Sequence, residues 1–116
     1  MINYEALFNL TYGLYIVSSG DSESGNGFIS NTVFQVTAEP PRFASCCNKD
    51  NYTAGLIQKH GAFAISVLRQ ETSAEIIGRF GYKSGRDYNK MKDMRLIYGE
   101  NTGVPVVLND CIAYME

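Results

Sequence analysis

Residues 31–53 are the most informative part of the chain and read NTVFQVTAEPPRFASCCNKDNYT. The alternation of apolar and polar side chains at the start of this stretch predicts a strand over residues 28–37. Pro40 and Pro41 lack backbone N–H donors, so we expect them to end the pairing of that strand. The apolar run at residues 43–47 predicts a further strand.

A short helix is predicted directly after this strand. Asp50 or Asn51 is a suitable N-cap residue, because its side chain can accept a hydrogen bond from a free backbone N–H of the first turn. Gly61 follows His60, and glycine in the left-handed conformation is typical of a helix end. The stretch therefore predicts strand, turn, strand and helix in succession.

The rest of the chain adds more strands than helices. Residues 18–27 are rich in Ser, Gly, Asp and Asn, which predicts a long hairpin loop. A capping-box spacing at residues 72–75 predicts a second helix over residues 73–80, and residues 81–95 are expected to be irregular. Further strands are predicted at residues 12–17, 62–68, 104–107 and 111–114. We therefore expect a mainly β fold, a small antiparallel barrel with one or two short helices.

Length and composition favour one ordinary globular domain over residues 1–116. The chain has 116 residues, 45% hydrophobic and 19% charged, with a net charge of −2. This charge gives no general attraction to nucleic acid or to an anionic membrane. The sequence shows no secretory signal and no apolar run long enough to span a bilayer, so the expected location is cytoplasmic.

The charges are unevenly distributed along the sequence. The first 41 residues contain no Lys or Arg and four acidic residues, whereas residues 79–95 contain six basic residues against Asp87 and Asp93. The basic segment is either a solvated loop or a patch that meets a phosphorylated ligand. Nucleic acid is disfavoured, because aromatic residues are not interleaved there as in a stacking surface.

The three cysteines are Cys46, Cys47 and Cys111. An odd number without framework spacing argues against disulfides, and no metal-binding spacing is present. If residues 43–47 form a strand, the two adjacent thiols point to opposite faces. We expect all three to be small core residues, as free cysteines usually are, with a reactive or ligand role as the alternative.

No catalytic constellation is evident in the sequence. His60 is the single histidine, and no phosphate-loop, dinucleotide-binding or zinc-protease motif occurs. If the protein is an enzyme, a cofactor is therefore expected to supply the reactive group.

Two segments have the chemistry to hold such a cofactor. Residues 48–53 lead into a helix N-terminus, where free N–H groups and the helix dipole favour an anion. Residues 31–37 carry small hydroxyl and amide groups that could meet the polar rim of a planar heterocycle. The alternatives are a simple helix cap for the first segment and a half-exposed strand for the second.

In combination, these motifs resemble a known family. The order Asn31-Thr32-x-x-Gln35-Val36-Thr37, Pro40-Pro41 and Asn48-Lys49-x-Asn51-Tyr52-Thr53 is similar to that of the flavin reductase-like, FMN-binding split-barrel proteins. The strand at residues 61–68 and the loop at residues 80–90 are also similar to the family pattern, in particular to the domains of flavoredoxins and high molecular weight rubredoxins.

The resemblance implies a split β-barrel homodimer that binds FMN near the subunit interface and accepts hydride from NADH or NADPH. The residues that it places beside the ring are Asn31, Thr32, Gln35, Val36 and Thr37. Those that it places along the ribityl chain and phosphate are Cys47, Asn48, Lys49, Asn51, Tyr52 and Thr53. It also places Phe80, Ser84 and Lys90 in a loop that borders the cofactor or the nicotinamide.

One departure from the family pattern concerns the end of the chain. Family members continue past a segment like residues 102–108 with several more strands, so the closing strands are expected to be missing here. We therefore expect either a flavin reductase that passes electrons to a protein, flavin or metal acceptor, or an FMN-binding electron carrier or sensor without nicotinamide turnover. A non-catalytic interaction domain that uses the basic segment is the third alternative.

Overall fold

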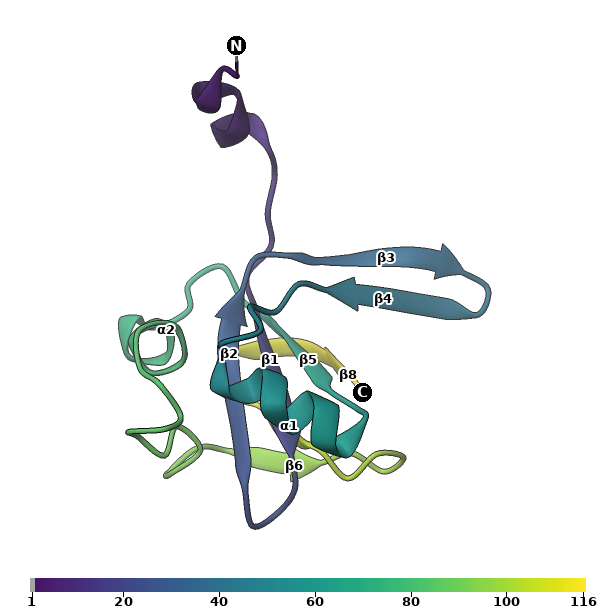
Figure 1. Ribbon diagram of the computed structural model, residues 1–116, viewed down its shortest axis with the longest axis vertical. Coiled ribbons are helices and arrows are strands. Elements are labelled where there is room, and N and C mark those ends of the chain that lie inside the picture. The colour runs from purple at the N-terminus through teal and green to yellow at the C-terminus, as the bar shows by residue number, and fades with distance from the viewer. Residues whose placement is uncertain (1) are drawn as a thin grey trace.

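A computed structural model describes residues 2–116, and most of its regular structure is β. Figure 1 shows a compact sheet-based body from which a long hairpin and an N-terminal segment extend. The elements, in chain order, are η1 (Tyr4–Asn9), β1 (Tyr15–Gly20), β2 (Gly25–Ser30), β3 (Val33–Ala38), β4 (Pro41–Ser45), α1 (Tyr52–His60), β5 (Ala64–Leu68), α2 (Ala74–Gly81), β6 (Leu96–Tyr98), β7 (Pro105–Val107) and β8 (Cys111–Met115). The predicted mainly β class with short helices is confirmed, whereas η1 and β6 were not predicted.

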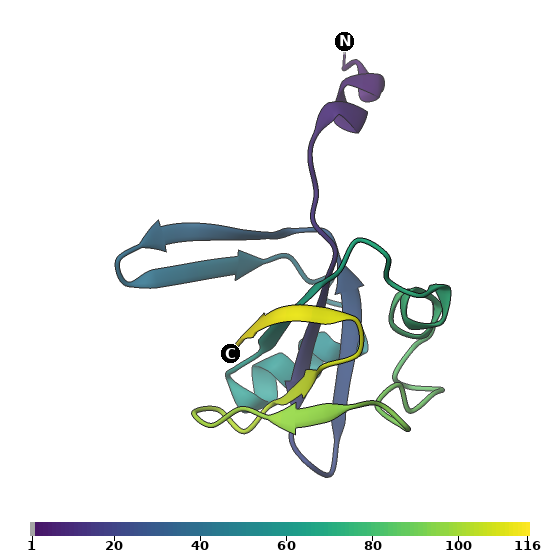
Figure 2. The same cartoon turned by 180° about the vertical axis from the view of Figure 1, so that it is seen from behind.

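The body is built on a four-stranded antiparallel sheet with the order β2-β1-β5-β8. Ile16 of β1 pairs with Ile29 of β2, and Val17 pairs with Ile65 of β5. β8 lies at one edge of this sheet, and the chain terminus at its end is visible in Figure 2. The core lies between the sheet and α2, where Ile16 and Phe80 are fully buried.

The predicted long loop at residues 18–27 is wrong, because most of it is strand. Ser18 and Ser19 belong to β1 and are fully buried, and Asn26 belongs to β2. The buried hydroxyls are satisfied, because Ser18 Oγ donates to Pro105 O over 2.6 Å and Ser19 Oγ donates to Ala62 O over 2.6 Å. Turn-forming residues thus occupy a strand where tertiary contacts supply their hydrogen-bond partners.

Serine side chains also attach the β6–β7 hairpin to the body. This hairpin forms its own two-stranded sheet rather than extending the main one. Ser66 Oγ of β5 donates to Val107 O over 2.8 Å, which adds to the bond from Ser18 to Pro105. Carbonyl oxygens of β7 therefore accept hydrogen bonds from serine hydroxyls of the main sheet, although β7 forms no backbone ladder with that sheet.

The predicted strand over residues 28–37 is divided into two in the structure. β2 ends at Ser30 in the main sheet, and β3 begins at Val33 in a separate hairpin with β4, which we call the arm (residues 33–45). The two prolines do not end the pairing, because Pro41 is the first residue of β4 and pairs with Ala38. The arm extends from the body in both views, and Phe34 and Val36 are each more than half exposed.

Both predicted helices are confirmed. Asn51 caps α1 by accepting a hydrogen bond from Thr53 N–H, and Gly61 ends it with φ 67° in the left-handed region. α2 is capped by Ser73, whose backbone N–H also donates to the Asp110 carboxylate over 3.0 Å. In the part of the chain described here, neither helix has the length and apolar character that a membrane span requires.

Candidate functional site

The N-terminus of α1 and the basic loop enclose a cleft of about 300 Å³, which we call the loop cleft. One wall is Asp50–Tyr52 at the start of α1, and the other is residues 81–86 together with Lys90. Segments about thirty residues apart in the sequence therefore meet at a helix N-terminus. Four predicted site residues line this cleft: Asn51, Tyr52, Ser84 and Lys90.

Lys90 is the most unusual residue of the loop cleft, because it is a cation with only 3% of its surface exposed. Its Nζ atom donates to Gly27 O over 2.9 Å and to Phe80 O over 3.2 Å. Among residues 2–116, no carboxylate forms an ion pair with it. Burial lowers the pKa of Lys90, because desolvation disfavours the charged amine. An ammonium group has three protons, so one donor is not used by these two bonds.

The loop is fastened to the start of α1 by its own contacts. A guanidinium nitrogen of Arg86 donates to Asp50 O over 3.1 Å, and its Cζ lies 5.9 Å from the centre of the Tyr52 ring. Gly85 lies so close to α1 and β2 that a Cβ atom there would be 2.6 Å from Asn26 Oδ1 and 2.6 Å from Tyr52 Cδ1. A larger residue here would force the Asn26 or Tyr52 side chain to shift, so the loop closely covers the helix N-terminus.

The basic side chains of the loop divide into two groups. Arg79 is used inside the fold, since it donates to Lys92 O over 2.7 Å and pairs with Glu75 over 3.1 Å. Lys83 and Arg86 line the loop cleft beside Lys90. The Lys83 amine also lies 4.1 Å from the centre of the Tyr88 ring. Part of the basic segment therefore forms a cationic site and part is structural.

Thr53 and Asn26 join α1 to β2 beneath the cleft. Thr53 is fully buried, and its Oγ1 accepts a hydrogen bond of 3.0 Å from Asn26 Nδ2. The Asn51 side chain accepts from Thr53 N–H over 2.9 Å. The sequence analysis did not identify Asn26, because it lies in a segment that was expected to be loop. The one sequence feature that could have indicated Asn26 is its amide side chain between two glycines, Gly25 and Gly27.

The predicted residues at the base of the arm lie in the two segments that join the arm to β2 and to α1. Thr32 Oγ1 donates to Asn31 Oδ1 over 3.0 Å, and Asn48 Oδ1 accepts from Asp50 N–H over 2.9 Å. Lys49 is exposed. Cys47 is half-buried, and burial raises the pKa of its thiol.

The expectation that the cysteines are core residues is wrong. Cys46 is exposed, and Cys47 and Cys111 are only partly buried. The predicted strand over residues 43–47 ends earlier in the structure, because β4 ends at Ser45 and residues 46 and 47 follow it.

The remaining predicted residues are separated from the loop cleft. Within the arm, Gln35 Nε2 donates to Thr37 O over 3.0 Å, and Thr37 Oγ1 donates to Pro40 O over 2.7 Å. The Val36 side chain is 58% exposed. Phe80 is 1% exposed and packs in the core, so its side chain has no free face toward the cleft. Its carbonyl oxygen is nevertheless one of the two acceptors of Lys90.

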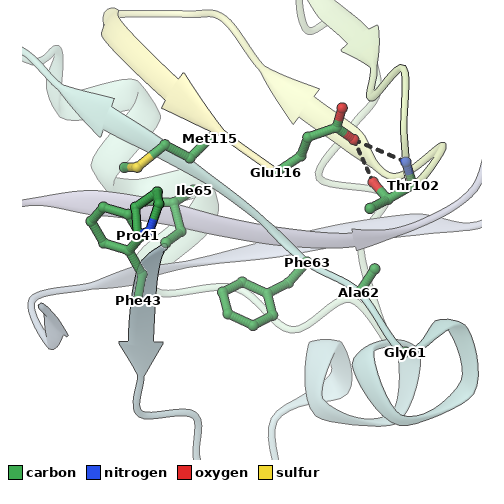
Figure 3. Close-up of a pocket in the computed structure, with 9 residues that line it drawn as sticks. All are labelled: Pro41, Phe43, Gly61, Ala62, Phe63, Ile65, Thr102, Met115 and Glu116. Carbon is green, nitrogen blue, oxygen red and sulfur yellow. Dashed lines mark hydrogen bonds between the residues drawn. The ribbon is translucent and has the colours of Figure 1, made fainter. Parts of the chain in front are cut away.

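A second cleft, of about 290 Å³, lies at the opposite end of α1, beside Gly61 (Figure 3). Its large apolar side chains come from the arm (Pro41, Phe43), from β5 and the residue before it (Ile65, Phe63) and from Met115 of β8. None of them was predicted as a site residue.

Glu116 closes one side of this second cleft. Its carboxylate accepts hydrogen bonds from Thr102 Oγ1 over 2.6 Å and from Asn101 N–H over 3.0 Å. These bonds, with that from Thr102 Oγ1 the largest cause, lower the pKa of Glu116. The carboxylate thereby holds the turn between β6 and β7.

Comparison with known proteins identifies the family. The model of the flavin reductase-like domain matches residues 7–116, and the chain therefore belongs to the flavin reductase-like family. The chain is 41% identical over 115 residues to the ferric-chelate reductase (NAD(P)H) of Archaeoglobus fulgidus, covering 99% of this chain and 68% of the relative. It is 42% identical over 112 residues to the high molecular weight rubredoxin of Moorella thermoacetica, covering 97% of this chain and 48% of the relative.

The fold is also that of a solved structure. Flavoredoxin from Methanosarcina acetivorans superimposes with a TM-score of 0.82 at 21% identity, over 98% of this chain and 60% of that one. This similarity confirms the predicted fold class. The chain spans between about half and two thirds of the length of these proteins.

Proposed function

We propose that this chain binds FMN and that the loop cleft holds the FMN phosphate. The observation that carries the proposal is Lys90, a buried amine that is paired with two carbonyl oxygens and, within residues 2–116, with no carboxylate. Burying a cation is costly unless an anion compensates it. A phosphate in the cleft would do so, with Lys83, Arg86 and the helix N-terminus adding positive potential.

Each segment of the site has a role in this proposal. Ser84 and the start of α1, from Asn51 to Thr53, surround the phosphate together with Lys90. Cys47, Asn48 and Lys49 follow the ribityl chain, and the polar residues of β3 and of the turn before it, from Asn31 to Thr37, meet the ring. The bound flavin would supply the hydride-accepting atom, while the chain orients it and excludes water.

FMN and riboflavin distinguish a phosphate site from a general ring site. We expect FMN to bind at least about tenfold more tightly than riboflavin, because only FMN engages charge-assisted hydrogen bonds in the loop cleft. Titration followed by flavin fluorescence measures both affinities. Equal affinities would show that the cleft holds no phosphate.

The proposed reaction is the transfer of electrons from NADH or NADPH through the flavin to an acceptor. The family description and the donor in the name of the Archaeoglobus relative support this activity. Anaerobic mixing of the FMN-loaded protein with NADH, and separately with NADPH, tests it, because reduction bleaches the flavin absorbance. No bleaching with either donor would favour the electron-carrier alternative.

We further propose that the chain acts as a homodimer, with a redox protein as one class of acceptor. Large apolar side chains are exposed on the arm (Phe34, Val36) and in the N-terminal segment (Leu7, Phe8), which extends away from the sheet. Apolar surface of this kind is typical of a protein interface. Light scattering that gives a monomer mass at micromolar concentration would contradict the dimer.

A further inference from the structure

We propose that Cys46 and Cys47 form a redox-active vicinal dithiol, which peroxide converts to a disulfide between adjacent residues and which thiols reduce again. The oxidation itself requires no bound flavin. Its effect on FMN affinity, argued below, rests on the proposed function.

The end of β4 makes this pairing sterically accessible. Within a strand, adjacent side chains point to opposite faces and their sulfur atoms cannot bond. Here β4 ends at Ser45, and Cys46 N–H makes the last bond toward the neighbouring segment, to Thr32 O over 3.2 Å. The next backbone hydrogen bond along the chain is from Asn51 N–H to Asn48 O, over 2.9 Å. The peptide that joins the two cysteines is therefore not held in a sheet ladder.

Both thiols are free, and they differ in exposure. Cys46 is exposed and is the thiol that an oxidant in solution reaches first. Cys47 is half-buried, with its Sγ 3.6 Å from Asn48 O, and burial raises the pKa of this thiol. The greater exposure of Cys46 favours it as the thiol that attacks the oxidant, and Cys47, the adjacent residue, is then the thiol that resolves the product.

The chemistry balances with hydrogen peroxide as the oxidant. The Cys46 thiolate attacks one peroxide oxygen, the O–O bond breaks, and Cys46 sulfenic acid and water form after protonation. Cys47 sulfur then attacks Cys46 sulfur, the S–O bond breaks, and a second water leaves. Two thiols and one peroxide give one disulfide and two waters, so two electrons pass from sulfur to oxygen.

Ring closure between neighbours makes this disulfide labile. Adjacent Cα atoms are about 3.8 Å apart across a trans peptide, whereas disulfides usually join Cα atoms about 4.4–6.8 Å apart. The connecting peptide must therefore distort, and strained, exposed disulfides are easily reduced. Because Asn48 and the Asn51 cap follow directly, we expect oxidation to disturb the segment assigned to the ribityl chain and phosphate.

Intact-mass spectrometry of the apoprotein tests the dithiol without any flavin. After treatment with one equivalent of hydrogen peroxide, the wild-type chain should lose two hydrogens and remain uncrosslinked on a non-reducing gel. Phenylarsine oxide should bind one molecule per reduced chain and none after oxidation. Cys46→Ser and Cys47→Ser should each abolish both results, whereas Cys111→Ser, the matched control, should retain them.

Other outcomes overturn the proposal. Retention of the mass loss in Cys46→Ser or Cys47→Ser, or an intermolecular crosslink through either thiol, would exclude a vicinal disulfide.

FMN titration then separates the dithiol proposal from the proposed FMN site. Reduced protein that binds no FMN contradicts the proposed function while the dithiol stands. Oxidised protein should bind FMN about tenfold more weakly than reduced protein, and equal affinities would overturn the predicted effect on the site.

Discussion

The loop cleft and the arm contain half of the residues predicted to contact flavin, but they are held in different ways. Around the cleft, Lys90, Gly85 and Thr53 are packed against other segments of the same chain. On the arm, the side chains of Gln35 and Thr37 bond only to neighbouring arm residues, and Phe34 faces solvent.

This difference separates what one chain organises alone from what it leaves incomplete. The cleft is preorganised, so a ligand there meets donors that are already fixed, which lowers the entropic cost of binding. A two-stranded hairpin by itself is only marginally stable in water. The arm therefore needs a surface from outside the chain, and in the proposed dimer the partner subunit supplies it.

The largest effect is expected from a charge on the arm. Phe34→Asp should weaken dimer association by about 2–4 kcal/mol, or roughly 30- to 1000-fold, because a buried aromatic anchor would be replaced by a desolvated carboxylate. Light scattering over a concentration series measures this change. Tyr82→Asp, at an exposed aromatic in the loop, is the matched control and should leave the dimer intact. If Phe34→Asp does not change the mass, the arm is not the interface.

The next largest effect is expected in the cleft. Lys90→Met keeps the approximate length of the side chain but removes the ammonium. FMN affinity should fall by about 1.5–3 kcal/mol, or roughly 10- to 150-fold, while riboflavin affinity changes little. Fluorescence titration measures both ligands, and Lys59→Met, at an exposed lysine of α1, provides the control. A parallel loss for riboflavin would indicate damage to the fold rather than a lost phosphate contact.

Gly85→Ala tests how tightly the loop is packed. Because the added methyl would meet Asn26 and Tyr52 at 2.6 Å, the free energy of unfolding should fall by about 1–3 kcal/mol. Urea denaturation measures the change. Gly78→Ala, in α2 with nothing within 4 Å of the added Cβ, should instead stabilise the protein by about 0.4–1 kcal/mol. The same sign for both variants would contradict the close approach of the loop.

A smaller loss of stability is expected when the hydrogen bond between β2 and α1 is removed. Thr53→Val removes the acceptor of Asn26 Nδ2 and leaves a buried donor unpaired. The free energy of unfolding should fall by about 1–2 kcal/mol, as measured by urea denaturation. Stability equal to wild type would mean that this hydrogen bond does not hold β2 to α1.

The smallest effect concerns pH and the cap of α2. The Ser73 N–H, followed by the ion pair with Arg69, holds the pKa of Asp110 below its ordinary value. A carboxyl group whose pKa is lower in the folded chain than in the unfolded chain stabilises the fold at pH values above its unfolded pKa of about 4. This stabilisation is lost as the pH falls through the folded pKa. Asp110→Asn should lower Tm at pH 7 by a few degrees at most, and the gap to wild type should close in acid. A gap that widens on acidification would refute this linkage.

Local sequence signals predicted several elements correctly. Asn51 and Gly61 bounded α1, and apolar alternation located β5. These predictions held because caps and side-chain periodicity act over one or two turns and need no distant partner. The order of motifs from residue 31 to residue 53 also indicated the family that comparison confirmed.

Other features depend on contacts between residues far apart in the sequence. Ser18, Ser19 and Asn26 look like loop residues, yet they are buried in strands because Pro105, Ala62 and Thr53 supply their hydrogen-bond partners. Residues 28–37 look like one strand, yet they divide between the sheet and the arm. No local pattern encodes either outcome.

The sequence by itself determined the mainly β class, the helix caps, the family and a basic segment of unknown use, because each is written in neighbouring residues. Only the tertiary structure decided that Lys90 is buried with no carboxylate partner among residues 2–116, that the loop closes on the α1 N-terminus, and that the adjacent cysteines lie beyond the end of β4. Burial and desolvation are properties of the whole packed chain, and they make an otherwise ordinary lysine the centre of the proposed anion site.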